Sequence, residues 1–189
     1  MEFWETVTSR QSIRDFDDRP VERAVIERVL EAAKLAPSST NEQPWHFVVV
    51  QGESRIRLGE IVAQSTVHLS EYMDVLGPER NEAAVTWYSS LGNAPVVVAV
   101  SAPRSSVEFQ AMNRYLSVGA AIENLLLAAT SEGLGACNVT CSYWVKNDLS
   151  AVLGLSDNDE LVSLIALGYP SDVPSVNPPV KPDDTVWLD

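Results

Sequence analysis

Three side chains suited to binding an anion occur at alternate positions near the start of the chain. Arg10, Ser12 and Arg14 stand at i, i+2 and i+4. In an extended backbone they project from one face, while Gln11 and Ile13 point the other way. Each guanidinium can contact two phosphate oxygens at once, and the serine hydroxyl adds another donor. The spacing predicts a phosphate clamp; the alternative is that both arginines form surface ion pairs with the aspartates that follow them.

Residues 37–43 form a second polar segment, rich in hydroxyl and amide side chains. Prolines bracket it at positions 37 and 44, and it runs into the apolar stretch at 47–50. Such a segment is typical of a loop that brings hydrogen-bonding groups to the mouth of a buried strand. With the clamp, it predicts a ligand site.

Alternating helices and strands are expected to position these two segments. The predicted helices cover residues 21–36, 55–64, 113–131 and 146–153, and the predicted strands cover 47–51, 96–100, 137–140 and 161–167. Residues 65–92 are harder to assign. They contain a break at Gly77-Pro78, followed by a helix that includes Trp87 and Tyr88.

Two segments are expected to need a partner surface. The helix at 113–131 is apolar around most of its circumference, which predicts deep burial or a subunit interface. The tail from Pro170 carries several prolines, so it is predicted to be an extended arm that must lie against something to be ordered.

Charge and composition argue against several classes of protein. The net charge of −13 disfavours nucleic-acid binding. No uninterrupted apolar run reaches the roughly 18 residues of a membrane helix. Acidic residues at positions 2 and 5 stand where a signal peptide is positively charged, so a cytoplasmic protein is expected.

Other catalytic and cofactor motifs find little support. Cys137 and Cys141 are expected to be free thiols, and no metal site is predicted because no histidine accompanies them. His46 and His68 lie outside metal-ligand and hydrolase motifs. No Gly-x-Gly-x-x-Gly or Walker turn follows a predicted strand, which disfavours a Rossmann dinucleotide site.

The order of the motifs resembles that of the FMN-dependent nitroreductase family. Its members carry Arg-x-Ser-x-(Arg/Lys), then a helix ending in Ala-Pro-Ser-Ser, and then Asn-x-Gln-Pro-Trp. Further matching stretches follow in the same order at residues 93–95, 117–129, 133–135, 164–170 and 181–182. Each stretch alone is weak evidence, but their common order across most of the chain is specific.

The resemblance implies an α+β fold, a nitroreductase-like α-β-α sandwich with a central mixed, mostly antiparallel sheet flanked by helices. It implies one domain over residues 1–189, with a variable substrate region at 65–92. It also implies a homodimer, with a C-terminal arm at 170–189 that extends onto the partner subunit.

The resemblance also implies non-covalent FMN and a set of residues that bind it. The phosphate would lie against the segment at 10–14 and Lys181, and the loop at 37–41 would reach the flavin from the partner. Backbone donors near residues 140 and 141 would approach the hydride-accepting nitrogen. The full set is Arg10, Gln11, Ser12, Arg14, Pro37, Ser38, Ser39, Asn41, Gln43, Thr140, Cys141 and Lys181.

This sequence departs from the family pattern in three respects. The Asn and Lys that larger members supply between the first two strands have no identifiable counterpart in residues 65–92. Gln11 stands where many members have a second arginine or a histidine, so the clamp carries less charge. Thr140 and Cys141 stand where the family often has glycine, which narrows the space over the flavin.

The predicted function is an FMN-dependent oxidoreductase in which NAD(P)H reduces the flavin and a small electron-poor acceptor takes the electrons. Nitroaromatics and quinones are the expected acceptors, and the chemistry is carried by the cofactor rather than by a catalytic side chain. Two alternatives stay open. One is a family member that oxidises or dehalogenates a specific metabolite, and the other is a protein that stores or senses FMN without turnover.

Overall fold

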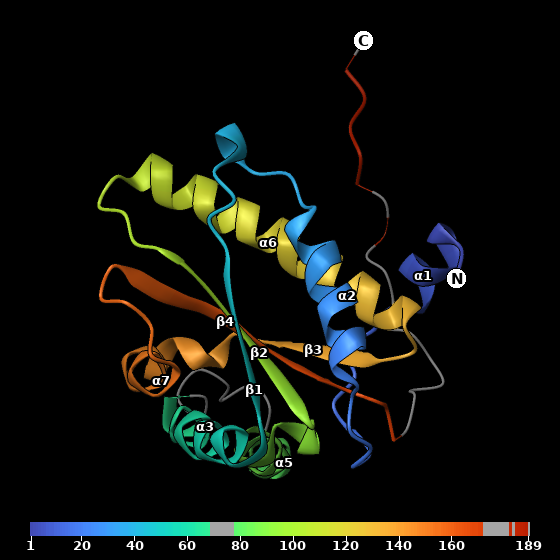
Figure 1. Ribbon diagram of the computed structural model, residues 1–189, viewed down its shortest axis with the longest axis vertical. Helices are drawn as coiled ribbons and strands as arrows, with labels where there is room; N and C mark the ends of the chain where they lie inside the picture. The colour runs from blue at the N-terminus through green and yellow to red at the C-terminus, as the bar shows by residue number, and fades with distance from the viewer. Residues whose placement is uncertain (69–77, 172–181, 183, 189) are drawn as a thin grey trace.

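A four-stranded antiparallel sheet forms the centre of the molecule in the computed structural model, which describes residues 1–68, 78–171, 182 and 184–188 (Figure 1). The spatial order of its strands is β1 (His46–Gln51), β2 (Val96–Pro103), β4 (Asp159–Gly168) and β3 (Gly135–Val139). Each neighbouring pair is antiparallel. The parallel component is an isolated bridge between Ser12 and Ala136, which places the N-terminal segment beside β3.

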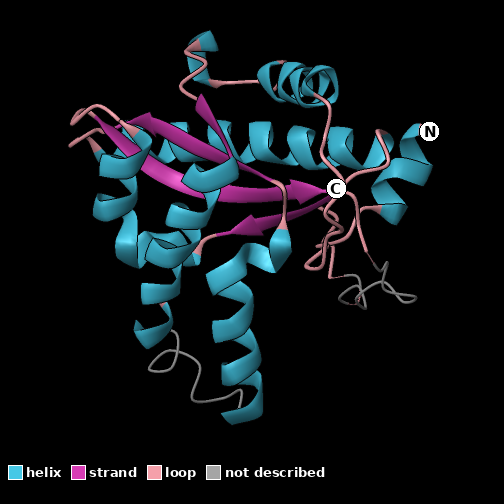
Figure 2. Cartoon of the chain, turned by 60° about the horizontal axis from the view of Figure 1, so that its bottom comes forward, coloured by secondary structure: helices cyan, strands magenta, loops and turns pink. Residues whose placement is uncertain are grey.

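Helices cover both faces of the sheet (Figures 1 and 2). One layer holds α2 (Arg23–Lys34) and α6 (Glu108–Ser131), with the short α1 (Phe3–Ser9) packed at α6; the other holds α3 (Gly52–Gln64), α5 (Pro78–Ser90) and α7 (Lys146–Leu153). The predicted α-β-α sandwich is confirmed.

The central strand β2 shows how the sequence specifies these layers. It is an almost uninterrupted apolar run and is buried along nearly its whole length. Successive side chains point to opposite faces of a sheet. Accordingly Val96, Val98 and Val100 pack with α2 and α6, while Val97 and Ala99 pack with α3 and α7.

The predicted elements agree with the structure, apart from their ends. β2 continues beyond residue 100 through a bulge, because the small side chains of Ser101 and Ala102 are also buried. β3 ends at Val139, one residue before the predicted end, so Thr140 already belongs to a turn. The predicted helix containing Trp87 and Tyr88 is α5.

Helix α6 differs along its length. In its second half, Val118, Ala121 and Leu125 are buried against α2 and the sheet. In its first half, the apolar and aromatic side chains are exposed by 45–69 %: Phe109, Met112, Tyr115 and Leu116. The apolar circumference noted in the sequence therefore divides into a buried half and an exposed stripe.

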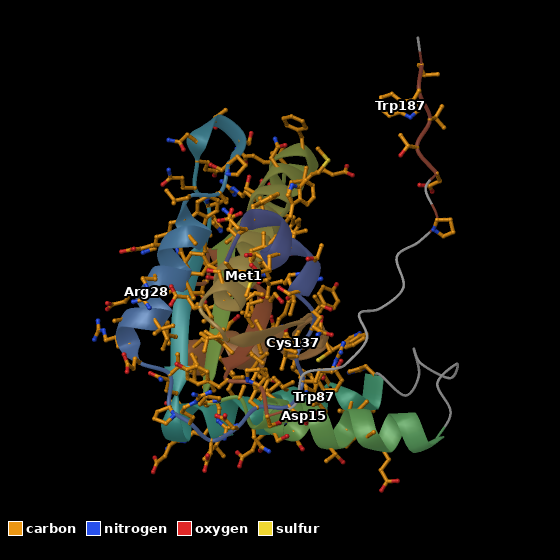
Figure 3. The ribbon with its side chains drawn as sticks, turned by 90° about the vertical axis from the view of Figure 1, so that its right-hand side faces the viewer. Met1, Asp15, Arg28, Trp87, Cys137 and Trp187 are labelled. Atoms are coloured by element: carbon orange, nitrogen blue, oxygen red, sulfur yellow. The ribbon has the colours of Figure 1, made fainter. Side chains whose placement is uncertain are left out.

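The ends of the chain hold a helix that the sequence analysis missed and segments that cannot be compared. Helix α1 begins with a capping box in which Glu2 and Glu5 each accept from the other's backbone N–H. The predicted break at Gly77 and the residues 172–181 and 183 lie outside the described residues, and Lys181 is among them. In the described part of the tail, Val186, Trp187 and Leu188 are exposed (Figure 3).

Within the described ranges, no helix combines the length and the apolar character that crossing a bilayer requires.

Candidate functional site

The clamp segment is extended and lies along the edge of β3. The Ile13 N–H donates to the Ala136 carbonyl at 3.0 Å, and the Ile13 side chain is buried. It packs so closely on Gly135 that a Cβ there would lie 2.7 Å from the Ile13 Cβ. Because Ile13 points inward, Ser12 and Arg14 are exposed on the other face, as the alternation predicted.

The two arginines of the clamp have different surroundings. The Arg10 Nε lies 3.6 Å from the Glu123 carboxylate on α6. Arg14 is exposed, and its guanidinium makes only a long hydrogen bond of 3.4 Å to the Ser12 carbonyl; within the described ranges no carboxylate forms an ion pair with it. Arg10 therefore does form a surface ion pair, but with Glu123 rather than with the aspartates that follow the clamp. The guanidinium of Arg14 is left able to bind an anion.

The backbone from Arg14 to Phe16 is fixed by the end of α5 and by the short helix η2 (Leu91–Asn93) that follows it. The Trp87 indole Nε1 donates to the Arg14 carbonyl oxygen at 2.5 Å, and the Phe16 N–H donates to the Gly92 carbonyl at 3.1 Å. Gly92 has a φ of +64°, and a Cβ there would come 1.8 Å from the Arg14 carbonyl oxygen. We refer to Trp87 and Gly92 together as the α5 brace; sequence reasoning missed it.

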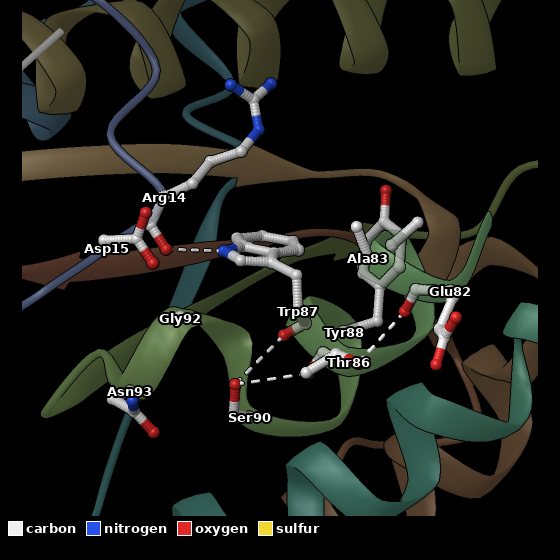
Figure 4. Close-up of a pocket in the computed structure, with 11 residues that line it drawn as sticks. Arg14, Asp15, Glu82, Ala83, Thr86, Trp87, Tyr88, Ser90, Gly92 and Asn93 are labelled. Atoms are coloured by element: carbon white, nitrogen blue, oxygen red, sulfur yellow. Dashed lines mark hydrogen bonds between the residues drawn. The ribbon is translucent and has the colours of Figure 1, made fainter. Parts of the chain in front are cut away.

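A cleft of about 860 Å³ lies beside this brace. Arg14 and Asp15 line it on one side, and the α5 residues from Glu82 to Tyr88 line it on the other (Figure 4). This volume is in the range of small-molecule sites. Trp87 presents an aromatic surface there, and the Arg14 carbonyl is held by the same indole.

The polar loop has an unusual backbone. Thr40, Asn41 and Gln43 have positive φ angles of 52°, 59° and 48°, in the left-handed region. Side chains of the loop support this shape, since the Gln43 N–H donates to Ser38 Oγ at 3.0 Å and Gln43 Nε2 donates to Asn41 Oδ1 at 3.0 Å. Asn41 and Gln43 themselves are exposed.

The structure does not bring this loop to the clamp of the same chain. The loop contacts α6 at Arg114 and Ser117, whereas Arg10 contacts α6 at Glu123. Six to nine residues of α-helix separate these contacts, which is roughly 9–13 Å along the axis. In Figure 1 the short helix η1 (Ser39–Asn41) stands at the top, while the segment after α1 descends on the right.

Thr140 and Cys141 lie at the other end of β3 from Ala136. Thr140 is exposed and precedes the short helix η3 (Cys141–Val145). Cys141 is buried, and its thiol interacts with Tyr88 and Ser65. Burial raises the pKa of the Cys141 thiol. Burial, together with the neighbouring Cys141, raises the pKa of Tyr88 to about 12. The Cys141 side chain therefore faces the interior, and only its backbone is suited to contact a ligand.

Both cysteines are free thiols, as predicted, and both are buried. Burial raises the pKa of Cys137 as well, although the nearby Arg14 opposes this effect. Figure 3 shows Cys137 on the same side of the molecule as Asp15 and Trp87. The clamp segment pairs with Ala136 near the start of β3, and Thr140 follows the last residue of the same strand.

The described residues fit a flavin mononucleotide. A phosphate group needs cationic and hydroxyl donors, and the exposed Arg14 and Ser12 supply both from one face. The flat ring needs a surface to stack on, and the mixed polar and apolar lining of the brace cleft includes the aromatic side chains of Trp87 and Tyr88.

The sequence over residues 7–169 matches the family model described as "Nitroreductase family". The chain belongs to the nitroreductase family. The predicted family is thereby confirmed, and the match covers every strand of the sheet.

Relatives of this nitroreductase-family chain extend over most of its length. A protein of Archaeoglobus fulgidus, provisionally named NADH dehydrogenase/NAD(P)H nitroreductase, is 32% identical over 170 residues, covering 88% of this chain and 84% of the relative. An iodotyrosine deiodinase of Haliscomenobacter hydrossis is 30% identical over 184 residues, covering 90% and 80%. Among solved structures, the FMN and NADPH-dependent nitroreductase NfnB from Sphigopyxis sp. strain HMH superposes with a TM-score of 0.82 at 25% identity, covering 100% of this chain and 99% of that one.

Proposed function

We propose that this protein uses NAD(P)H to reduce a bound FMN and then passes the electrons to a small electron-poor acceptor such as a nitroaromatic or a quinone. The prediction of an oxidoreductase that depends on FMN and NAD(P)H is confirmed by the family membership and its relatives. The acceptor and the residues that bind the flavin remain proposals.

The observation that carries the proposal is the exposed Arg14 guanidinium, which no described carboxylate neutralises, beside the Ser12 hydroxyl on the edge of β3. In this proposal Arg10, Gln11, Ser12 and Arg14 hold the phosphate. The turn at Thr140 and Cys141 directs backbone groups to the ring. FMN, when bound, supplies the hydride chemistry that no side chain carries.

A homodimer with shared sites explains where the polar loop acts. The loop carrying Asn41 and Gln43 is separated from the clamp of its own chain, yet it exposes amide groups suited to the carbonyl and imide edge of a flavin. The exposed stripe on α6 and the exposed aromatic residues of α1 offer an apolar surface for a second copy. We therefore assign Pro37, Ser38, Ser39, Asn41 and Gln43 to the flavin of the partner subunit. The C-terminal arm is assigned to the partner's surface.

The test begins with the absorbance spectrum of the purified protein, which should show bound flavin. NAD(P)H consumption should then depend on an added acceptor such as menadione or a nitrofuran. A protein that binds FMN but shows no turnover with any electron-poor acceptor would instead be a flavin-storage or flavin-sensing protein.

A second candidate function is reductive dehalogenation, because one relative at 30% identity is named an iodotyrosine deiodinase. Release of iodide or bromide from a halogenated phenol in the presence of NAD(P)H or dithionite would support it. Turnover of nitro compounds and quinones without halide release would favour the first proposal.

The clamp should make FMN bind far more tightly than riboflavin, since riboflavin lacks the phosphate. Arg14→Ala should weaken FMN binding by roughly 1.5–3 kcal/mol, the range for hydrogen bonds to charged groups, and should leave riboflavin binding nearly unchanged. Quenching of flavin fluorescence on titration measures both affinities. The matched control is Arg23→Ala, whose guanidinium is exposed on α2 and pairs with Glu27. Equal affinity of the wild type for the two flavins would contradict the clamp.

A further inference from the structure

The polar loop is held in a conformation that its own residues do not favour. A non-glycine residue in the left-handed region is disfavoured by the approach of its Cβ to the following carbonyl oxygen, somewhat less for asparagine. Thr40, Asn41 and Gln43 all adopt it within four residues. Such a backbone persists only where neighbouring groups fix it.

Glu42 lies between two of these residues and has an ordinary helical φ of −63°. Its carboxylate is held by Arg114 on α6. Arg114 Nε donates to Glu42 Oε1 at 2.8 Å, and a terminal nitrogen of the same guanidinium donates to that oxygen at 2.6 Å. The remaining terminal nitrogen donates to two backbone carbonyls, those of Pro103, the last residue of β2, at 3.2 Å and of Arg104, the next residue, at 3.0 Å.

The Arg114–Glu42 ion pair is less exposed to solvent than the other arginine–carboxylate pairs among the described residues. The Arg114 side chain is 14% exposed and that of Glu42 is 33%, whereas the surface pair Arg23–Glu27 is 91% and 55% exposed. Shielding from water strengthens charge-assisted hydrogen bonds, and exposed pairs contribute little. Arg114 therefore connects the second half of the loop to the sheet, while Ser117 fixes the first half by accepting from the Ser39 N–H at 3.3 Å.

We propose that Arg114 is a positioning residue for the flavin, acting through Glu42. By holding the carboxylate against α6, it keeps the left-handed backbone on both sides of Glu42 and directs the exposed Asn41 and Gln43 amides away from the protein. Without it the loop relaxes toward ordinary φ values and the amides lose their common direction. The inference rests on the proposed flavin-binding role of these two amides.

The experiment compares Glu42→Gln, Arg114→Gln and the double variant with the wild type, and uses Arg23→Gln as the matched control. Affinities for FMN and riboflavin come from fluorescence titration, and hydrogen–deuterium exchange of residues 38–44 is followed without flavin. Size-exclusion chromatography and thermal melts establish that each variant keeps its assembly and fold.

Each single variant should bind FMN roughly tenfold more weakly. Its affinity for riboflavin should fall by the same factor, because the loop does not face the phosphate. The double variant should be no worse than the singles, since all three break one pair. Exchange in the loop should become faster, and the control should change none of these quantities. Arg114→Lys, which keeps the charge but not the fork of donors, should fall between wild type and Arg114→Gln.

The outcomes separate the two proposals. A wild-type protein that binds no flavin would overturn the proposed function itself. If the wild type binds FMN and the variants bind it equally well, Arg114 does not position the site. Weaker binding with unchanged exchange in the loop would also overturn the inference, because the effect would not act through the loop.

Discussion

Replacing Gly92 with alanine should destabilise the protein by about 3 kcal/mol or more, the largest effect expected of an added methyl group at any glycine that the structure describes. Two causes add. The φ of +64° disfavours any side chain, and the new Cβ would lie 1.8 Å from the Arg14 carbonyl oxygen. Relief of this overlap requires the backbone of the clamp to move. For a domain of this size the melting temperature should fall by roughly 6–12 °C.

Gly154→Ala is the matched control, because Gly154 has a φ of +65° with no atom within 4 Å of the added Cβ. It therefore carries the conformational penalty without the overlap, about 1 kcal/mol. Thermal and urea denaturation of both variants would isolate the contribution of the contact with Arg14. Similar losses of stability in the two variants would show that the clamp backbone moves away from Gly92 at little cost.

Two impaired variants should restore each other when they are combined in one dimer. Arg14→Ala removes a phosphate ligand, and Asn41→Asp replaces an amide donor with an acceptor while tolerating the left-handed backbone. If the loop serves the partner's flavin, a mixed dimer has one site with both changes and one intact site. Purified mixed dimers should bind about half of the wild-type flavin at a concentration where neither parent binds appreciably.

The mixed dimer is obtained by co-expression with two different affinity tags and two purification steps. Its flavin content and its NAD(P)H oxidation with menadione are compared with those of both parents. The control pairs Arg10→Ala with Arg14→Ala, which lie in one clamp and should not restore each other. Mixed dimers of Arg14→Ala and Asn41→Asp that fold but regain nothing would place both residues in the site of a single chain.

Local patterns allowed much of the fold and part of the site to be predicted. The alternation of Ile13 with Ser12 and Arg14 depends only on the geometry of an extended backbone, and the structure retains it. The apolar run at 96–100 likewise predicts a strand, and the structure buries that strand along nearly its whole length. Ser101 and Ala102 continue that strand without an apolar signal, so its end was not predictable from composition.

The groups that hold the site in place could not be predicted, because their partners are distant in sequence. Trp87 donates to a carbonyl 73 residues earlier, and Arg114 binds a carboxylate 72 residues earlier. No spacing rule joins such pairs. Gly92 gave a weak signal, since glycine before an apolar strand often marks a close backbone approach, but its partner could come only from the structure.

The α5 brace has a consequence for how this chain can diverge. Helix α5 lines the cleft with side chains, so changes along it alter which molecules fit there. The same helix supports the Arg14 carbonyl through Trp87, and the chain reaches Gly92 only five residues later. An insertion or deletion between these two residues would displace one of the two contacts that fix Arg14. Under the proposed function, exchanging side chains on α5 or changing the chain length before Trp87 would therefore alter the range of acceptors, and the stretch from Trp87 to Gly92 must keep its length.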